Sequence, residues 1–248
     1  MTFVIATGNA GKLNEMKELL SELDIEAVSM REAGVDIEVD ETGATFYDNA
    51  LLKARALYEA TGMPAIADDS GLMVDFLDGA PGVHTKRYGA GATVGGATSV
   101  YKHDGEDTLE RNVLGEGRLD GEVLEGSVSG EDKPGEVKPA GVTLGEREAY
   151  LYLLEQMKDS EQRDAKFVCS IVCYFPDGRI ISASGECLGA ITAAPRGDGG
   201  FGYDPVFQVA GTAMTMAELS PDEKNAVSHR GAALREFARL LRYEEDAG

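Results

Sequence analysis

Two adjacent aspartates, Asp68 and Asp69, are the side chains with the most evident chemistry in this sequence. They follow a short apolar run at residues 63–67 and precede Ser70 and Gly71, which predicts a buried strand that ends in an acidic turn. Adjacent carboxylates repel each other unless a bound proton or a cation relieves the repulsion, and hard divalent metal ions prefer such oxygen ligands. A solvated Asp-Asp-Ser turn is the alternative, and the short motif alone favours it.

A loop near the start of the chain has the composition of a phosphate-binding turn. It connects an apolar run at residues 3–6 to a helix with apolar positions at 13, 16, 20 and 23, and it reads Thr7-Gly8-Asn9-Ala10-Gly11-Lys12. This order places free backbone N–H groups and a lysine at a helix N-terminus, where an anion is stabilised. The loop is not a Walker A motif, because Leu13 stands where Ser or Thr would bind magnesium. A simple helix-entry turn is the alternative, and the motif in isolation favours it.

A second lysine and a third carboxylate lie in or near the next predicted helix, at residues 46–61, which follows a strand predicted at 27–30. Asn49 and Lys53 are four residues apart and share one face of this helix, apart from its apolar stripe. Glu41 lies just before the helix. A surface lysine and a solvated loop acid remain the plain alternatives for Lys53 and Glu41.

The last third of the chain combines an aromatic glycine loop with basic residues. Residues 194–205 form this loop, which carries Phe201 and Tyr203. A helix is predicted to begin after Ser220, because proline occupies the first helical position and glutamate the third. The sequence His-Arg-Gly at residues 229–231 is expected to interrupt the chain before a last amphipathic helix. An aromatic in a glycine loop is by default a core side chain, so Phe201 also has that interpretation.

The middle of the chain predicts strands, a hairpin and a short helix. Residues 72–77 are expected to form a strand, residues 146–157 an amphipathic helix, and residues 166–175 and 179–184 a β-hairpin joined by Pro176-Asp177-Gly178. Cys169 and Cys173 alternate with apolar residues on one face of the first hairpin strand, which indicates buried side chains. Together with Cys187 they make three cysteines, which are too few and odd in number for a disulfide framework. Their spacing is not that of a zinc site.

Composition excludes several classes of function. The 248 residues carry 44 acidic against 23 basic side chains, a formal charge of −21, which repels nucleic-acid phosphates. A small anionic substrate must therefore arrive with a metal ion or meet a local cluster of positive charge. No early segment resembles a signal peptide and no apolar run reaches membrane-spanning length, so a cytoplasmic protein without a membrane partner is expected.

A change of composition marks one stretch within an otherwise single α/β domain of residues 1–248. Residues 104–148 contain 13 acidic and 5 basic side chains with nine glycines and few large apolar residues. Glycine-rich acidic sequence does not bury enough apolar surface to form a core. We interpret residues 104–145 as an exposed insertion, which a surface loop tolerates at small cost in free energy.

Together these segments resemble the inosine triphosphate pyrophosphatase family. The resemblance rests on five separated blocks in the family's order, which cover nearly the whole chain outside the insertion. The blocks are residues 6–12; residues 41–46 with Asn49-Ala50 and Lys53-Ala54; residues 67–72 with 79–83; residues 195–197 with 201–207; and residues 217–219 with 223–225 and 228–231. The family pattern has a short segment where the acidic insertion stands here.

The resemblance implies a fold, a reaction and a set of site residues. The fold is α/β, with a mixed central β-sheet flanked by helices, two lobes around a nucleotide cleft and a homodimeric assembly. The reaction is Mg²⁺-dependent hydrolysis of ITP, dITP and XTP to the monophosphate and pyrophosphate. By matching position, Asp69 is the proton acceptor, Glu41 and Asp69 are metal ligands, and Asp68 is a further candidate ligand. The phosphate-binding residues are Thr7, Gly8, Asn9, Ala10, Gly11, Lys12, Lys53 and Ser70, and the nucleoside pocket comprises Phe201, Gly202, Tyr203, Asp204, Lys224, His229 and Arg230.

Elementary chemistry supports these roles. Cleavage of a phosphoanhydride needs positioning and charge neutralisation, which a divalent metal and two lysines supply. Arg230 and a protonated or suitably tautomeric His229 are donors that match a 6-oxo purine and oppose the 6-amino group of adenine. Three alternatives remain open: a hydrolase of the same fold acting on other modified triphosphates, a nucleotide-binding sensor, and an adaptor that acts through its acidic insertion.

Overall fold

A six-stranded mixed sheet forms the centre of the protein. A computed structural model describes residues 1–88, 93–94, 97–98 and 145–247. The strand order is β2-β1-β3-β6-β7-β8, in which β1 runs parallel to β2 and β3 and the remaining neighbours are antiparallel. The strands are β1 (Phe3–Ile5), β2 (Ala27–Ser29), β3 (Ala65–Val74), β6 (Asp164–Tyr174), β7 (Ile180–Ile191) and β8 (Phe207–Val209); β4 (Thr93–Val94) and β5 (Ala97–Thr98) pair separately. The predicted mixed sheet flanked by helices is confirmed.

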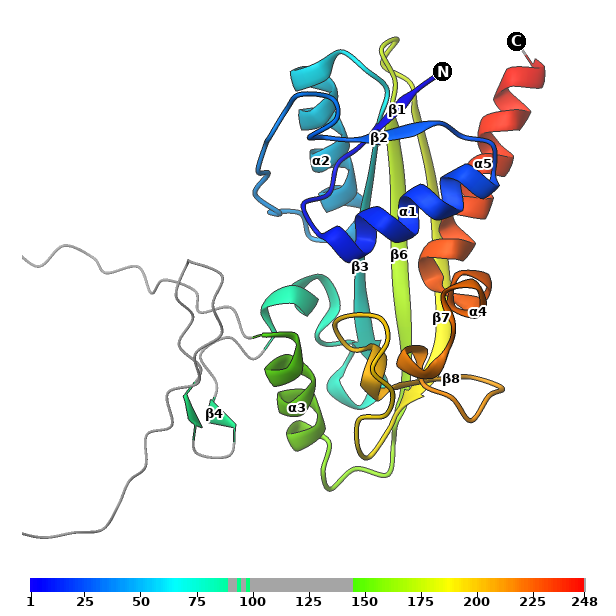
Figure 1. The fold of residues 1–248 in the computed structure, drawn as a ribbon. Helices are drawn as coiled ribbons and strands as arrows, with labels where there is room; N and C mark the ends of the chain where they lie inside the picture. Colours follow the sequence, from blue (N-terminus) through cyan, green and yellow to red (C-terminus); the bar gives the residue numbers. More distant parts are fainter. Residues whose placement is uncertain (89–92, 95–96, 99–144, 248) are drawn as a thin grey trace, which may run out of the picture.

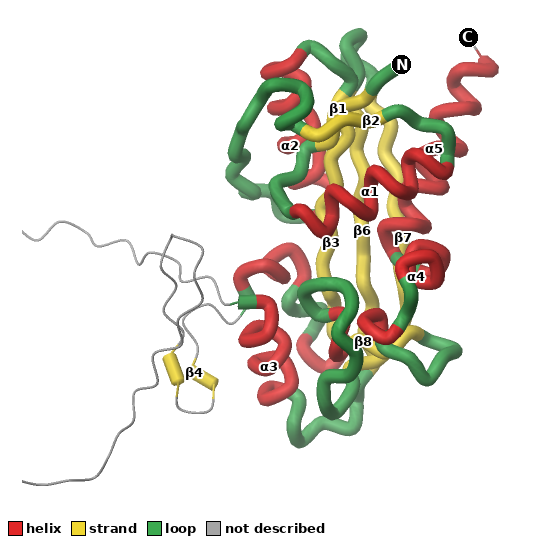
Figure 2. Tube along the Cα trace, viewed as in Figure 1, coloured by secondary structure: helices red, strands yellow, loops and turns green. Residues whose placement is uncertain are grey.

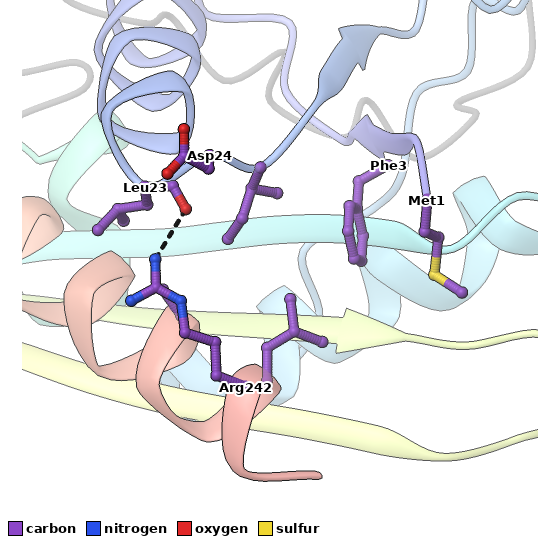
Figure 3. Close-up of a pocket in the computed structure, with 8 residues that line it drawn as sticks. Met1, Phe3, Leu23, Asp24 and Arg242 are labelled. Atoms are coloured by element: carbon purple, nitrogen blue, oxygen red, sulfur yellow. Dashed lines mark hydrogen bonds between the residues drawn. The ribbon is translucent and has the colours of Figure 1, made fainter. Parts of the chain in front are cut away.

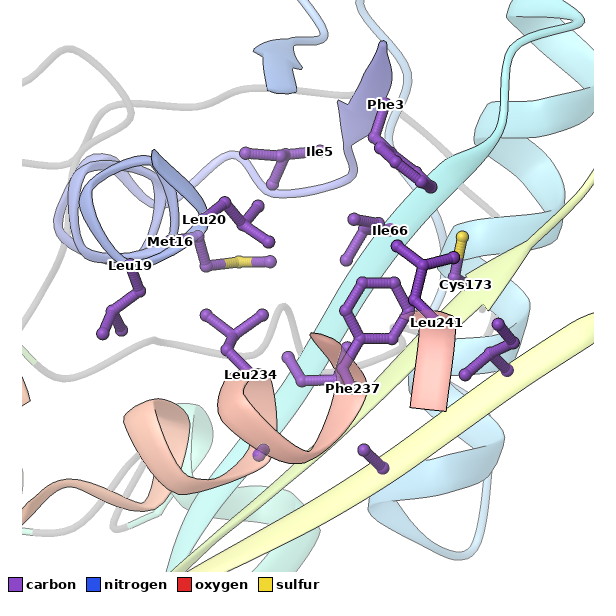
Figure 4. Close-up of a cluster of buried hydrophobic side chains, with 14 of the residues drawn as sticks. Phe3, Ile5, Met16, Leu19, Leu20, Ile66, Cys173, Leu234, Phe237 and Leu241 are labelled. Atoms are coloured by element: carbon purple, nitrogen blue, oxygen red, sulfur yellow. The ribbon is translucent and has the colours of Figure 1, made fainter. Parts of the chain in front are cut away.

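Helices cover both faces of this sheet (Figure 1). On one face, α1 (Ala10–Glu22) and α5 (His229–Ala247) pack against a core that includes Met16, Leu234 and Ile66 (Figure 4). On the opposite face, α2 (Phe46–Thr61) packs Ala50 and Ala54 against Ala65 and Ala67 of β3. A capping box at Thr45 begins α2 and a left-handed Gly62 ends it, so local sequence fixes both ends as predicted.

The apolar cores divide the molecule into two lobes. The lobe with α1, α2 and α5 contains the two cores just described, whereas a third core joins α3 (Glu146–Gln156) to the far ends of β3, β6 and β7. This second lobe also contains β8 and consists largely of loops, as Figure 2 shows. Strands β3, β6 and β7 run through both lobes, so residues in the middle of β3 lie where the lobes meet.

The predicted acidic turn is wrong, because β3 is one continuous strand. It pairs with β6 from Ala65 to Val74, through Asp68, Asp69 and Gly71 without a break. Acidic residues and glycine favour turns locally, but a full antiparallel ladder to a long neighbouring strand overrides that preference. The predicted strand at 72–77 also ends early, since residues 75–77 form the 3₁₀ helix η1 (Asp75–Leu77).

The expected interruption at residues 229–231 is wrong as well. His229 and Arg230 form the first turn of α5, and the break in the chain falls one residue earlier, at Ser228. The Ser228 hydroxyl accepts a hydrogen bond from the Gly231 N–H at 3.0 Å, which satisfies a free amide of the new helix. The predicted capping box of α4 (Pro221–Val227), formed by Ser220 and Glu223, is confirmed.

Two further sequence predictions are confirmed. Strands β6 and β7 form the hairpin, with Gly178 at a φ of +84° in its turn, and β7 continues beyond the predicted residue 184 to Ile191. All three cysteines are buried and free. None of the helices in the described part of the chain is long and apolar enough to cross a membrane. The insertion predicted at residues 104–145 lies outside the described residues, apart from Gly145.

Candidate active site

The predicted site residues gather where β1 ends beside β3. Strand β1 pairs with β3 at Ala65 and Ile66, and the chain then leaves the sheet as the loop that enters α1. Asp68, Asp69 and Ser70 lie on β3 just after Ala67, beyond this last pairing. In α/β sheets the region outside the carboxyl end of a parallel strand is where ligands bind. The edge of β3 therefore presents these three polar side chains at the junction of the lobes.

Asp68 and Asp69 point to opposite faces of the sheet. Successive side chains of a strand alternate between faces, and Ile66 packs with α1 and α5 whereas Ala67 packs with α2. Asp68 and Ser70 therefore share the face of α1 and α5, and Asp69 lies on the face of α2. We call their surroundings the Asp68 cluster (Lys12, Glu15, Asp68, Ser70, Asp204, Lys224 and Arg230) and the Asp69 cluster (Glu41, Asn49, Lys53 and Asp69).

Asp68 is fully buried, and one of its two oxygens is paired with two cations. Its Oδ2 atom lies 3.0 Å from Lys12 Nζ and 3.2 Å from Arg230 Nη2, and it accepts a hydrogen bond of 3.1 Å from the Ser70 hydroxyl. Burial by itself raises the pKa of this carboxyl, but the charges of Lys12 and Arg230 outweigh burial and bring the pKa far below its ordinary value. Asp68 is thus a permanently ionised anchor for two cations.

The Asp68 cluster extends along α1 to the predicted nucleoside pocket. Glu15 Oε1 lies 2.6 Å from Lys224 Nζ, and its other oxygen pairs with Arg230. Lys224 Nζ also lies 2.6 Å from Asp204 Oδ2. Sequence reasoning missed Glu15, although its position three residues after Lys12 places the two side chains on one helix face.

Phe201 connects the aromatic loop to the start of α1. Its ring lies 4.5 Å from Lys224 Nζ and 5.8 Å from the guanidinium carbon of Arg230. A Cβ atom on Gly11 would come within 2.8 Å of this ring, so glycine is needed for the contact. The Phe201 N–H donates to Asp204 at 2.9 Å. The loop predicted to bind the base therefore lies against the loop predicted to bind phosphate.

The other residues of the aromatic loop are tied to the second lobe. The Gly202 N–H donates a 2.9 Å hydrogen bond to the Glu146 carboxylate at the start of α3. The Tyr203 hydroxyl donates to the carbonyl of Thr85, in the 3₁₀ helix η2 (Gly82–Arg87), at 3.2 Å. The loop thus spans the junction between the lobes.

His229 is a neutral, buried side chain beside Arg230. Its ring stacks on Phe167 with centroids 4.8 Å apart and planes 14° apart. Burial, followed by the charge of Arg230, lowers the pKa of His229 well below its ordinary value. Of the two forms considered from the sequence, the protonated ring is therefore disfavoured and the neutral tautomer remains.

The Asp69 cluster contains more carboxylate than cation. Lys53 Nζ lies 2.8 Å from Glu41 Oε1 and 3.4 Å from Asp69 Oδ1, so one ammonium bridges two acids. Burial raises the pKa of Asp69 despite the opposing charges of Lys53 and Lys12. The pKa of Glu41 is lowered, since Lys53 outweighs the effect of burial there. Asp69 is thus the more basic of the two adjacent aspartates.

The two clusters together carry no surplus of positive charge. Their four cations, Lys12, Lys53, Lys224 and Arg230, all pair with the five carboxylates Glu15, Glu41, Asp68, Asp69 and Asp204, which gives a formal charge of −1. These nine side chains therefore do not provide the local excess of positive charge that a free nucleotide would need. A bound metal ion would have to supply that charge.

The donor set at Asp69 suits a magnesium ion that also contacts the substrate. Within the described ranges, no three His, Cys, Asp or Glu side chains stand close enough to hold a metal ion by themselves. Mg²⁺, however, usually binds through one or two carboxylates and takes its other ligands from water and substrate phosphates. Glu41 and Asp69, already joined by one cation, fit that arrangement. Asp68 fits it less well, because its side chain is fully buried and Lys12 and Arg230 already pair with its Oδ2 atom; only the buried Oδ1 atom lacks a hydrogen-bond partner in the described part of the chain.

The predicted phosphate loop closes the start of α1. Thr7 Oγ1 accepts the Asn9 N–H at 3.2 Å, and Asn9 Oδ1 accepts the Lys12 N–H at 2.9 Å as the N-cap of the helix. Gly8, Ala10 and Gly11 complete this turn.

A cavity of about 320 Å³ elsewhere, lined by Leu23, Ile25 and Arg242 among others, includes none of the predicted site residues (Figure 3).

Comparison with known proteins agrees with the fold and with the resemblance in sequence. The Ham1 family matches residues 3–114 and 138–240, so that 115–137, within the acidic stretch, remain unmatched. A dITP/XTP pyrophosphatase of Aquifex aeolicus is 40% identical over 247 residues, with 100% of both chains covered. A HAM1 protein structure from Coxiella burnetii is 33% identical, with a TM-score of 0.70, and covers 98% of this chain and 99% of that one.

A third relative leads to the same result. The structure of a nucleoside-triphosphatase / dITP/XTP pyrophosphatase from Mycobacterium abscessus is 34% identical, with a TM-score of 0.60, and covers 97% of this chain and 99% of that one. Both structural matches extend over nearly all of each chain and share the helix-flanked mixed sheet. On this combined basis of sequence, fold and site geometry, the chain belongs to the Ham1 family.

Proposed function

We propose that this protein is a Mg²⁺-dependent nucleoside triphosphate pyrophosphatase that hydrolyses ITP, dITP and XTP to the monophosphate and pyrophosphate. The observation that carries the proposal is the contrast between two neighbouring aspartates: Asp68 is paired with two cations, Lys12 and Arg230, whereas Asp69 shares the single cation Lys53 with Glu41 and has a raised pKa. Relatives named dITP/XTP pyrophosphatase support the substrate class.

Asp69 serves as the proton acceptor in this proposal. A water molecule attacks phosphorus, the bond between the α- and β-phosphates breaks, and the proton of the water passes to the Asp69 carboxylate while pyrophosphate leaves. A carboxylate whose pKa is raised by burial is a better base than an ordinary aspartate. When bound to Glu41 and Asp69, Mg²⁺ supplies neutralisation of the phosphate charge.

The lysines and the loop amides orient the phosphates. Lys53 adjoins both proposed metal ligands, and Lys12 lies at the N-terminus of α1 beside the loop of Thr7, Gly8, Asn9, Ala10 and Gly11. Ser70, at the neighbouring position of β3, would contribute its hydroxyl by exchanging the hydrogen bond that it donates to Asp68 for one to a phosphate oxygen. Positioning and charge neutralisation are the main requirements for cleavage of a phosphoanhydride.

The nucleoside pocket selects a 6-oxo purine. It comprises Phe201, Gly202, Tyr203, Asp204, Lys224, His229 and Arg230, with Phe201 stacked on the base. Arg230 and the N–H of neutral His229 donate to the 6-oxo group, and a buried donor left unpaired by adenine costs about 1–3 kcal/mol. One or two such contacts correspond to roughly ten- to a thousand-fold discrimination. We further expect a homodimer, located in the cytoplasm with the nucleotide pool that it would cleanse.

A product assay tests the proposal against its alternatives. Purified protein is incubated with ITP, XTP, dITP, ATP and modified pyrimidine triphosphates, with Mg²⁺ or with EDTA, and the products are separated by ion-exchange chromatography. The expected result is monophosphate and pyrophosphate from ITP, dITP and XTP, with Mg²⁺ only. Diphosphate and phosphate would indicate cleavage at the terminal bond. Nucleotide binding without turnover would indicate a sensor, and neither binding nor turnover would favour an adaptor.

A further inference from the structure

We propose that Asn49 is a positioning residue that fixes the orientation of the Asp69 carboxylate. The inference rests on the proposed function, in which Asp69 is the proton acceptor. Asn49 shares a helix face with Lys53, but no role follows for it from the sequence. In the structure it is 1% exposed and contacts both elements that contribute proposed metal ligands, the loop of Glu41 and strand β3.

The orientation of the Asn49 amide follows from its two partners. Its Oδ1 atom accepts the Gly43 N–H at 2.7 Å, and its Nδ2 atom donates to Asp69 Oδ2 at 3.0 Å. A backbone N–H can only donate, so the amide oxygen must face Gly43 and the NH₂ group must face Asp69. The exchange of amide oxygen and nitrogen that often leaves an asparagine ambiguous is excluded here by chemistry.

This contact gives the two oxygens of Asp69 different tasks. Oδ2 accepts from Asn49, whereas Oδ1 faces Lys53 at 3.4 Å, on the side of Glu41. Oδ1 is therefore the oxygen assigned to the metal ion and to the proton of the attacking water. Without the donor at residue 49, the plane of the carboxylate is no longer fixed, and its oxygens can turn away from Lys53 and Glu41.

The surroundings of Asn49 are rigid enough for this role. Asn49 and Lys53 are one helical turn apart on α2, and both connect the loop at residues 41–43 to Asp69. The side of α2 that faces the sheet is fixed by Ala50, Ala54 and Leu57, all fully buried against β3 and its neighbours. Partners of metal ligands that are held in this way commonly contribute 10–100-fold to metal affinity or activity, roughly.

Two variants separate the contacts of Asn49. Asn49→Ala removes both hydrogen bonds. Asn49→Asp keeps an acceptor for Gly43 but removes the donor to Asp69. We expect kcat for ITP to fall roughly 10–100-fold in both variants. In Asn49→Ala we also expect binding of Mn²⁺, measured by electron paramagnetic resonance without turnover, to weaken by a similar factor.

Asp48→Ala is the matched control. Asp48 lies in the same helical turn, and its carboxylate accepts from the Thr45 N–H and hydroxyl at 3.1 and 2.7 Å. Its removal loosens the start of α2 without changing any contact of Asp69, so kcat and Mn²⁺ binding should stay at wild-type values. Circular dichroism and thermal unfolding establish that each variant is folded.

The outcomes distinguish this inference from the proposed function. Wild-type protein that leaves ITP and XTP intact would refute the function, and Mn²⁺ binding would still decide the role of Asn49. Active wild-type protein with unchanged kcat in folded Asn49→Ala would overturn the inference alone. An equal loss in Asp48→Ala would also overturn it, since a general loosening of α2 would then be sufficient.

Discussion

The two faces of β3 show how one pair of adjacent acids acquires two different environments. On the face of α1 and α5, Asp68 lies in a cluster in which three carboxylates meet three cations. On the face of α2, Asp69 and Glu41 share the single cation Lys53. The first cluster is electrically balanced and the second lacks one positive charge.

This difference supports the proposed division of roles, in which Asp68 stabilises the structure and Asp69 takes part in the chemistry. Asp68 is 1% exposed and its pKa is depressed, so it remains a carboxylate, with Oδ2 paired to Lys12 and Arg230 and Oδ1 buried without a hydrogen-bond partner among the described residues. Asp69 has a raised pKa and shares the single cation Lys53 with Glu41, and both features support its proposed roles as proton acceptor and metal ligand. Because they are neighbours on one strand, a shift of β3 by one residue in its pairing register would exchange the faces of the sheet on which they lie.

The largest expected effect is the loss of turnover in Asp69→Asn. Asparagine has the same shape but cannot accept the proton of water, and general base catalysis contributes about 10²–10⁴-fold. We expect kcat for ITP to fall by at least that factor, while the folding stability stays the same or rises, since burying the Asp69 charge is unfavourable. Pyrophosphate release and urea unfolding measure the two quantities. Substantial residual turnover would mean that another group accepts the proton.

Asp68→Asn should show the opposite pattern, with stability as the main loss. Removal of one member of a buried ion pair leaves Lys12 without a carboxylate and Arg230 with Glu15 alone, which costs about 3–5 kcal/mol. We expect the midpoint of urea unfolding to fall well below that of wild type and of Asp69→Asn. Equal stability of the two asparagine variants would remove the distinction between the faces of β3.

The pH dependence of this difference has a definite sign. The pKa of Asp68 is lower in the folded than in the unfolded protein, so its contribution to stability is complete above the unfolded-state value of about 4. That contribution is lost as the pH falls toward the folded-state pKa. The stability gap between wild type and Asp68→Asn should therefore narrow in acid. A gap that is constant down to strongly acidic pH would exclude an electrostatic origin.

The parts of the site that sequence predicted well depend on local signals. The limits of α2 follow from the capping box at Thr45 and the left-handed Gly62, and the turn into α1 follows from the glycines and the N-cap Asn9. Each of these features is decided within a few residues of chain. The resemblance to a known family added the order of the blocks, and the Ham1 relatives agree with it.

The division between Asp68 and Asp69 could not be predicted in the same way. In a turn, both carboxylates can face one cation, and the sequence accordingly made Asp68 a candidate metal ligand. Residues 68 and 69 are in a strand, which places their side chains on opposite faces, because β3 pairs with β6. Strand β6 lies about a hundred residues away along the chain. Glu15 was missed for a related reason, since its partners Lys224 and Arg230 reach it only through tertiary packing.

A smaller expected effect concerns the position of the first turn of α5 beside Asp68. Gly185 of β7 faces the first turn of α5, where an added Cβ would meet the His229 carbonyl oxygen at 2.3 Å and the Ala233 nitrogen at 2.5 Å. Gly185→Ala should therefore displace His229 and Arg230. A misplaced hydrogen bond of about 1 kcal/mol lowers the preference for ITP over ATP by roughly five- to tenfold.

Gly189→Ala provides the matched control in the same strand. A Cβ atom there would meet the Gln208 carbonyl oxygen, also at 2.3 Å, and the ring of Phe207, away from α5. We expect a comparable loss of stability in the two variants but a change in selectivity only for Gly185→Ala. Ratios of kcat/KM for ITP and ATP measure this. Equal selectivity in both variants would show that the position of α5 against β7 does not control base recognition.

The smallest expected effect tests whether Asn9 binds phosphate or only begins the helix beside Asp68. Its Oδ1 atom already accepts the Lys12 N–H at 2.9 Å, so the structure gives it a capping role independent of any ligand. Asn9→Ala should cost about 1 kcal/mol of stability, and Asn9→Ser should restore most of it, because serine is an equally good N-cap. If the Asn9 NH₂ group also donates to phosphate, Asn9→Ser will recover stability while KM for ITP stays raised. If both quantities recover together, capping is the whole contribution of Asn9, and phosphate binding at this end of the site falls to the backbone amides and Lys12.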